Sequence, residues 1–172
     1  EFLGAQYLRK IFSVRGAVRA AYLAVCGLGY FESYLNGKKT GNDMLSPAFT
    51  RYDAECMYLV YDVRTLLREG ENALGVILGN GWYNCFAEDP WNTRAATWRH
   101  VPKGILELHI LYEDGRRETI LSDPSWKASK GPITFNGIRN GEFYDARLEL
   151  GNWTMPDYDD TNWAKTKIIK SP

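Results

Sequence analysis

Residues 72–83 read Asn-Ala-Leu-Gly-Val-Ile-Leu-Gly-Asn-Gly-Trp-Tyr, and the rest of the chain is organised around them. Leu74, Val76 and Leu78 alternate along this segment, so an extended backbone places all three on one face. The apolar run stops at residues 79–81, Gly-Asn-Gly, which tolerate the positive φ of a tight turn. The pattern predicts a strand in the interior of a sheet, closed by a sharp turn.

Trp82 and Tyr83 follow this turn directly. Two large aromatic residues at the end of a buried strand can form a ligand platform, because each has an apolar ring and a polar tip. They can also plug the end of a β-sandwich. Both interpretations stay open, and the plug is favoured because Trp82 follows the buried strand so closely.

The composition excludes several classes of protein. Lys and Arg together number 21, as do Asp and Glu, which argues against partners such as nucleic acid or an anionic membrane surface. No apolar run approaches the ~18 residues of a membrane span. The length predicts one domain, residues 1–172. Since there is no initiator Met, we expect a fragment of a larger protein, periplasmic or extracellular if that protein carries a signal peptide and otherwise cytoplasmic.

The remaining pattern predicts an all-β fold. Extended segments are expected at residues 6–14, 17–28, 30–35, 56–62, 72–79, 106–110 and 118–121, with shorter ones near 143–144 and 166–169. Gly27 and Gly29 predict a bulge or bend, Asn36-Gly37 a hairpin turn, and residues 63–67 a single helical turn. Roughly eight to ten short strands, with turn signals about every 8–12 residues, indicate an antiparallel β-sandwich or jelly roll.

Few residues suggest chemistry. The three cysteines lack a CxxC spacing, so a zinc site or a disulfide framework is not supported, and the sequence leaves one disulfide open. His100 and His109 have no partner at metal-binding spacing. The sequence contains no nucleophile elbow, P-loop or dinucleotide motif.

Two acidic segments are candidates for functional sites. Glu142 and Asp145 lie three positions apart, which in an extended segment directs them to opposite faces, so they are poorly placed as a glycosidase pair. Asp157, Asp159 and Asp160 lack the central Gly and distal Glu of a calcium loop. We expect these aspartates to cap turns while the nearby Trp163 packs inward.

Several motifs together resemble a known family. They are Gly-Leu-Gly-Tyr-Phe-Glu-Ser-Tyr-Leu-Asn-Gly-Lys-Lys at 27–39, Leu-Ser-Pro at 45–47, Thr-Arg-Tyr at 50–52, Tyr-Asp-Val at 61–63, Leu-Gly-Asn-Gly-Trp-Tyr at 78–83, Gly-Glu-Phe-Tyr-Asp-Ala-Arg at 141–147 and Asp-Asp-Thr-Asn-Trp at 159–163. In this order and spacing, the chain resembles the N-terminal β-sandwich domain of bacterial α-L-rhamnosidases of glycoside hydrolase family 78. Some of the motifs recur in other galactose-binding-like sandwiches.

The resemblance implies a jelly-roll module attached to an α/α-barrel that removes terminal rhamnose and carries the catalytic carboxylates. It leaves three interpretations open for this chain: a non-catalytic carbohydrate-recognition module, with rhamnose-containing glycans as partners; a structural module that packs against the barrel; or, least favoured, a free-standing enzyme. No catalytic residue is expected in the first two cases. The resemblance implies no required cofactor and leaves calcium open, since some related modules bind rhamnose through it.

If a sugar binds, three segments offer both stacking surface and polar groups: 80–83, 86–98 and 136–145. The candidate substrate-binding residues are Asn80, Trp82, Tyr83, Asp89, Trp91, Asn92, Asn140 and Glu142. Trp82 or Trp91 would supply the ring face, and the amides and carboxylates would bind hydroxyl groups. Oxygen atoms of Asp89 and the asparagines are also the chemically suitable ligands for calcium.

Overall fold

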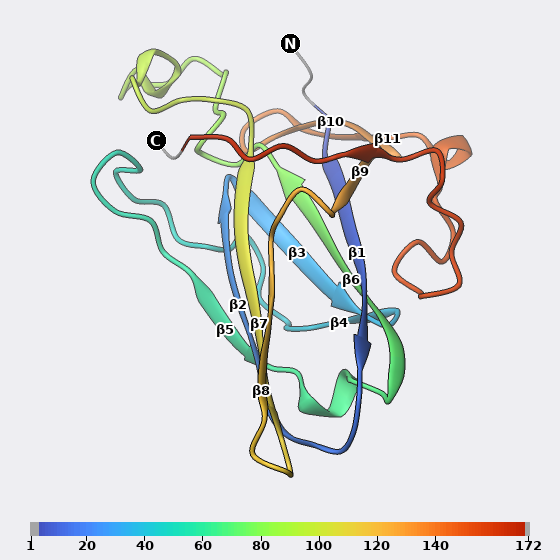
Figure 1. Cartoon of the computed structure of the whole chain (residues 1–172). Helices are drawn as coiled ribbons and strands as arrows, with labels where there is room; N and C mark the ends of the chain where they lie inside the picture. The colour runs from blue at the N-terminus through green and yellow to red at the C-terminus, as the bar shows by residue number, and fades with distance from the viewer. Residues whose placement is uncertain (1–3, 171–172) are drawn as a thin grey trace.

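The computed structural model describes residues 4–170, which form two antiparallel sheets packed face to face (Figure 1). The larger sheet has the order β12-β9-β1-β6-β3-β4, the smaller one β5-β2-β7-β8, and the hairpin β10-β11 stands apart. The strands are β1 (Gln6–Val14), β2 (Val18–Leu28), β3 (Tyr30–Leu35), β4 (Lys38–Lys39), β5 (Leu59–Asp62), β6 (Gly70–Gly79), β7 (Lys103–Tyr112), β8 (Arg117–Leu121), β9 (Lys127–Lys130), β10 (Ile133–Gly137), β11 (Gly141–Tyr144) and β12 (Ala164–Lys165). The predicted antiparallel β-sandwich is confirmed.

Strand β6 occupies the interior of the larger sheet, as its sequence predicts. It pairs with β1 on one side and β3 on the other, so both rows of its backbone groups are hydrogen-bonded. Leu74, Val76 and Leu78 belong to the main core between the sheets and are at most 3% exposed. Their alternation therefore places one face of β6 in that core, while Ile77 packs on the other face.

A second core covers the outer face of the larger sheet. There Trp153 and Trp163 pack with Tyr7 of β1. At the centre of this region Arg9, only 1% exposed, donates from Nε to the Trp153 carbonyl (2.9 Å) and forms an ion pair with Asp160. The expected inward packing of Trp163 is confirmed, and the buried arginine was not predicted.

The turns largely follow the sequence. Asn36 and Gly37 both have positive φ, 50° and 82°, and join β3 to β4. The bend predicted at Gly27 and Gly29 lies at Gly29 (φ 107°), where the chain passes from the smaller sheet to the larger one. Asp159 caps its turn by accepting a hydrogen bond from the Thr161 N–H (3.0 Å). The helical turn expected at 63–67 is a short 3₁₀ helix, Arg64–Leu66.

Other expectations need correction. The strand expected at 56–62 begins only at Leu59, where its pairing with β2 starts. Residues 166–169 are not a strand: β12 ends at Lys165, and the chain then leaves the sheet. Strands β9 and β10 were not predicted at all. The three cysteines are free thiols. No helix within residues 4–170 is long and apolar enough to cross a membrane.

The first prediction concerns Gly29. A Cβ atom built there would lie 2.1 Å from the Gly79 carbonyl oxygen, at a backbone φ that side chains disfavour. Gly29→Ala should therefore destabilise the fold by at least ~2 kcal/mol, since strain and backbone overlap add. Gly115→Ala is the control: it has φ 86° but open space around the new atom, so only the ~1 kcal/mol conformational cost is expected. Equal losses in urea unfolding would contradict this account.

The second prediction concerns alkaline pH. Burial raises the pKa of Tyr7 to about 12, against the opposing effect of its hydrogen bond with the Ile133 backbone. Because the unfolded phenol ionises near ~10, the contribution of Tyr7 is complete below pH ~10 and is lost as the pH rises toward 12. Urea unfolding at these two pH values should show a loss smaller by roughly 2 kcal/mol in Tyr7→Phe than in the wild type. An identical loss would exclude Tyr7 as its source.

Candidate functional site

The candidate site lies at the end of the sandwich where β6 stops, beside the hairpin β10-β11 (Figure 1). The Asn80 backbone N–H donates to the Asn136 side-chain oxygen (2.7 Å), and the Asn80 amide donates to the Asn136 carbonyl (2.8 Å). Asn80 also accepts from Asn84 (2.6 Å) and is fully buried. It thus joins the turn to the hairpin and presents no surface to a ligand.

Tyr83 is fully buried as well and acts as the plug that the sequence favoured. Its ring packs edge-on against Tyr52, with centroids 5.2 Å apart, and stacks with Trp98 at 6.1 Å. Cys26 and Leu28 complete this third apolar cluster. Of the two aromatic residues after the turn, Tyr83 therefore closes the core.

Trp82 has a mixed position. It is half-buried, its side chain is hydrogen-bonded with that of Tyr30, and its ring lies 5.8 Å from that of Phe49. The Arg139 guanidinium stands over the Trp82 ring, 5.6 Å from its centroid. With Phe49 beside the ring and Arg139 over it, Trp82 offers little open face for a sugar.

Trp91 is different, because 72% of it is exposed. Its ring is contacted by the same Arg139, whose guanidinium carbon lies 5.5 Å from the centroid. The neighbouring Asn92 is exposed and adopts a left-handed backbone (φ 53°), which directs the loop into a short 3₁₀ turn, Thr93–Ala95. Of the two tryptophans considered from sequence, Trp91 has the freer ring face.

Asp89 shapes the loop that carries Trp91. Its Oδ1 accepts from the backbone N–H of Trp91 (2.8 Å) and of Thr93 (3.3 Å). Partial burial opposes ionisation, but the hydrogen bonds from Thr93 and Trp91 and the charge of Arg139 prevail and lower the pKa of Asp89. The carboxylate is thus ionised at neutral pH and is engaged with its own loop.

The hairpin supplies the remaining candidates. Asn140 is exposed and its N–H closes the turn on the Gly137 carbonyl (3.1 Å). Glu142 is exposed and lies opposite Asn136 in the register. Asp145 is bound by both arms of Arg147, at 2.8 and 2.7 Å, and the hydrogen bonds lower its pKa. A lowered pKa is the opposite of what a general acid requires.

The structure therefore brings together part of the predicted set. Trp82, Asp89 and Trp91 meet at Arg139, a residue that sequence reasoning missed. No local motif marks Arg139, since its position depends on how the hairpin β10-β11 folds onto the loop after β6. Asn92 follows Trp91 in the chain and Asn140 follows Arg139, so both residues lie beside this cluster.

These residues supply only part of a calcium coordination shell. Within residues 4–170 no three His, Cys, Asp or Glu side chains gather closely enough to hold a metal. The Oδ1 atom of Asp89 already accepts two backbone hydrogen bonds, whereas its Oδ2 atom is buried with no hydrogen-bond partner among these residues. A calcium ion here would take most of its oxygen ligands from carbonyls, amides or a sugar.

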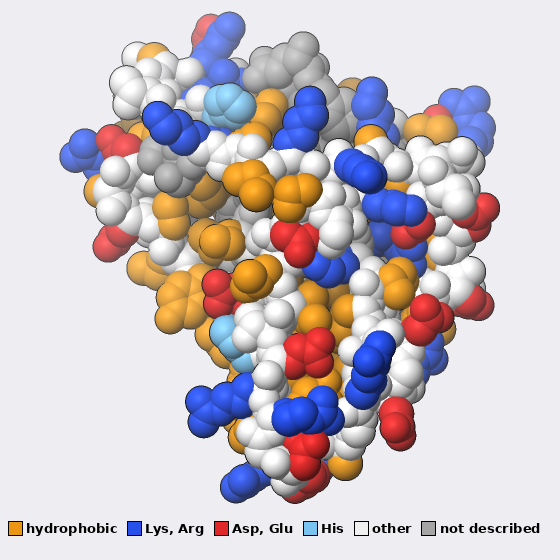
Figure 2. All heavy atoms as spheres, in the orientation of Figure 1, with side chains coloured by type: hydrophobic (Ala, Val, Ile, Leu, Met, Phe, Trp, Pro, Cys, Tyr) orange, Lys and Arg blue, Asp and Glu red, His pale blue; other side chains and the backbone are white. Residues whose placement is uncertain are grey.

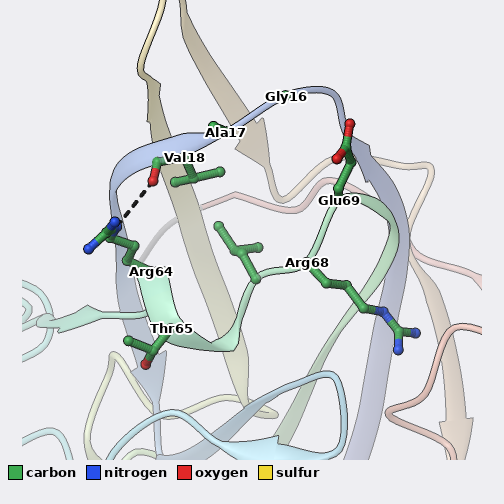
Figure 3. Close-up of a pocket in the computed structure, with 8 residues that line it drawn as sticks. Gly16, Ala17, Val18, Arg64, Thr65, Arg68 and Glu69 are labelled. Atoms are coloured by element: carbon green, nitrogen blue, oxygen red, sulfur yellow. Dashed lines mark hydrogen bonds between the residues drawn. The ribbon is translucent and has the colours of Figure 1, made fainter.

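Two hollows elsewhere are less suited to sugar. One, of ≈ 560 Å³, lies between the ends of the sheets under residues 166–170, and its lining is mostly aliphatic, including Leu8, Val76 and Leu78. The other is an open crevice of ≈ 540 Å³ at the opposite end of the sandwich (Figure 3), between Gly16–Val18 and Arg64–Glu69. In it Arg64 donates to the Val18 carbonyl (3.1 Å), and the described lining contains no aromatic ring.

Known proteins match nearly the whole chain. A family model described as the α-L-rhamnosidase N-terminal domain matches residues 16–172. An α-L-rhamnosidase of Formosa agariphila is 43% identical over 166 residues, which are 95% of this chain and 17% of that protein. The chain thus spans about a sixth of the length of this relative.

Solved structures agree. The α-L-rhamnosidase from Dictyoglumus thermophilum superimposes with a TM-score of 0.89 at 39% identity, over 98% of this chain and 18% of that one. The Streptomyces avermitilis α-L-rhamnosidase complexed with L-rhamnose gives 0.91 at 35% identity, over 98% and 16%. The resemblance inferred from the sequence motifs is confirmed, and this chain belongs to the α-L-rhamnosidase N-terminal domain family.

Proposed function

We propose that this chain is a non-catalytic module of a larger α-L-rhamnosidase and that it recognises carbohydrate. The observation that carries the proposal is the exposed Trp91 ring, held beside Trp82 by their shared contact with Arg139. An exposed indole presents a flat apolar face on which the C–H side of a sugar can stack. Rhamnose is the first ligand to test, since a relative has been solved with it.

In this proposal the sugar stacks on the face of Trp91 that Arg139 leaves open. Asn92 and Asn140 are exposed and flank the cluster, so their amides can bind hydroxyl groups, and Glu142 follows on the hairpin. Asn80 and Tyr83 act behind the surface by fixing the turn and the core. Calcium remains an optional participant, because oxygen atoms of a sugar can complete a coordination shell that the protein does not.

A second role, packing against the catalytic barrel of the parent enzyme, is favoured by a different observation. The segment leading to β5 exposes large apolar side chains: Met44 (81%), Leu45 (66%), Phe49 (53%), Met57 (49%) and Tyr58 (64%). Figure 2 shows hydrophobic side chains gathered along the margin of the molecule where Figure 1 places β5 and this segment. Such a surface is typical of a contact between domains. Phe49 of this segment also packs against Trp82, so the apolar surface adjoins the tryptophan cluster, while no ring of the segment contacts Trp91 itself within residues 4–170.

The third prediction tests sugar recognition. Calorimetry with L-rhamnose should detect binding to the wild type, and Trp91→Ala should weaken it at least tenfold, because the stacking surface is removed. Since Trp91 is largely exposed, its replacement should leave the unfolding midpoint nearly unchanged. Tyr58→Ala, an equally exposed aromatic residue on the other surface, is the matched control and should bind like the wild type. Titrations with and without calcium test its participation.

If the wild type releases no heat with rhamnose in either buffer, sugar recognition is excluded for this ligand and the packing role becomes the leading one. If Tyr58→Ala weakens binding as much as Trp91→Ala does, the site is in the wrong place.

The fourth prediction is that the isolated chain does not hydrolyse p-nitrophenyl α-L-rhamnoside. Arg147 lowers the pKa of Asp145, which is the opposite of what a general acid requires, and Glu142 is exposed on the hairpin. Release of nitrophenol should equal that of a protein-free blank. Turnover that disappears in Glu142→Gln would show that the chain is catalytic after all.

A further inference from the structure

Arg139 has an arrangement that stacking of a neutral sugar does not explain. Its guanidinium carbon lies 5.6 Å from the Trp82 centroid and 5.5 Å from the Trp91 centroid, both within cation–π range. The two rings come from different parts of the loop after β6, and Arg139 comes from the turn between β10 and β11. Three segments thus converge on one exposed cation.

The hydrogen-bonding edge of this cation is available. Within residues 4–170, Arg139 donates no hydrogen bond to the protein and has no carboxylate within ion-pair distance. The exposed arginines of comparable turns behave differently: Arg147 holds Asp145 and Arg116 holds Asp114, each through the guanidinium. Contacts with aromatic rings do not use the N–H donors of a guanidinium, and Arg139 is exposed, so these donors can serve a ligand.

The carboxylate of Asp89 does not satisfy those donors. The charge of Arg139 contributes to the lowered pKa of Asp89, but Oδ1 of Asp89 accepts from the backbone N–H groups of Trp91 and Thr93, and Oδ2 is buried with no hydrogen-bond partner among the described residues. Asp89 therefore stabilises the presence of a cation without forming an ion pair with it. A guanidinium restricted by two rings loses less rotational freedom on binding than a free arginine does.

We propose that Arg139 is the subsite for a carboxylate on the bound glycan, so that the module prefers oligosaccharides containing a uronic acid. The inference rests on the proposed carbohydrate recognition and adds the substrate class. A neutral sugar stacks on the open face of Trp91, and the carboxylate of an adjacent uronic acid reaches round the ring edge to the guanidinium. Two parallel N–H···O hydrogen bonds are the geometry that arginine and a carboxylate favour.

The experiment compares two ligands that differ in one group: a rhamnosyl-glucuronic acid disaccharide and its carboxyl-reduced counterpart, rhamnosyl-glucose. By calorimetry in low-salt buffer, the wild type should bind the acidic ligand about fivefold more tightly, the range of a partly exposed charge-assisted contact. The preference should shrink toward unity in ~1 M salt. Arg139→Gln should abolish this preference. Because Arg139 also contacts both tryptophan rings, any further loss of affinity should be the same for the acidic and the neutral ligand.

Two further variants make the test specific. Arg147→Gln removes the same charge from the same region but contacts neither tryptophan, so it should keep the full preference. Arg139→Lys keeps the charge but loses the planar pair of donors, so the preference should fall to about twofold even if Arg139→Gln disturbs the loop. Circular dichroism of each variant verifies the fold.

The outcomes separate the two proposals. Equal affinity of the wild type for both ligands overturns the carboxylate subsite and leaves carbohydrate recognition standing. Equal loss of preference in Arg147→Gln and Arg139→Gln also overturns it, because general charge would then be the cause. Absence of binding to either ligand overturns carbohydrate recognition and the subsite together.

Discussion

The paired hydrogen bonds between Asn80 and Asn136 are the constraint on which the candidate site depends. They connect the end of the most central strand to a hairpin that belongs to neither main sheet. The contact requires close approach: a Cβ at Gly79 would lie 3.1 Å from the Asn136 oxygen, and one at Gly29 only 2.1 Å from the Gly79 carbonyl. Backbone therefore packs closely on backbone here. The same contact between the turn and the hairpin places Arg139 beside the tryptophans.

The four residues of the turn, 80–83, differ in how far they are buried. Asn80 and Tyr83 are fully buried, while Trp82 is half-buried. Buried polar groups must be hydrogen-bonded to be tolerated, and Asn80 is, through Asn84 and Asn136. The turn thus fixes the position of the Trp82 ring.

The long strands could be predicted from the sequence because in each of them apolar residues alternate and so gather on one face. Strands β1, β2, β3 and β6 lie where that pattern placed them. Strands β9 and β10 have no such pattern, because both are short and residues 127–137 are mostly polar or turn-forming. They become strands by pairing with β1 and β11, respectively. Arg9 was missed for a related reason: its burial depends on carbonyl groups of Trp153 and Met155, far away in the sequence.

The candidate site was predicted only in part. The missing part again depends on contacts between residues far apart in the sequence. Aromatic and amide residues suggested three segments, and either Trp82 or Trp91 was expected to supply the ring face, although the place of Trp82 after a buried strand favoured a structural role. Arg139 contacts both rings, so what distinguishes them is the partial burial of Trp82 and the packing of Phe49 against it, and Phe49 lies outside the segment that carries either ring. Such contacts depend on the topology of the fold, so a local sequence pattern does not predict them.

The energies indicate why a single ring is an incomplete site. Covering most of an exposed indole removes roughly 100 Å² of apolar surface from water, worth about 2–3 kcal/mol. Millimolar affinity already requires about 4 kcal/mol, after the cost of immobilising the ligand has been met. Trp91 alone therefore gives weak binding, whatever sugar it stacks on. A second directional contact beside it changes this balance, and the unpaired N–H donors of Arg139 are the described groups best placed to make one.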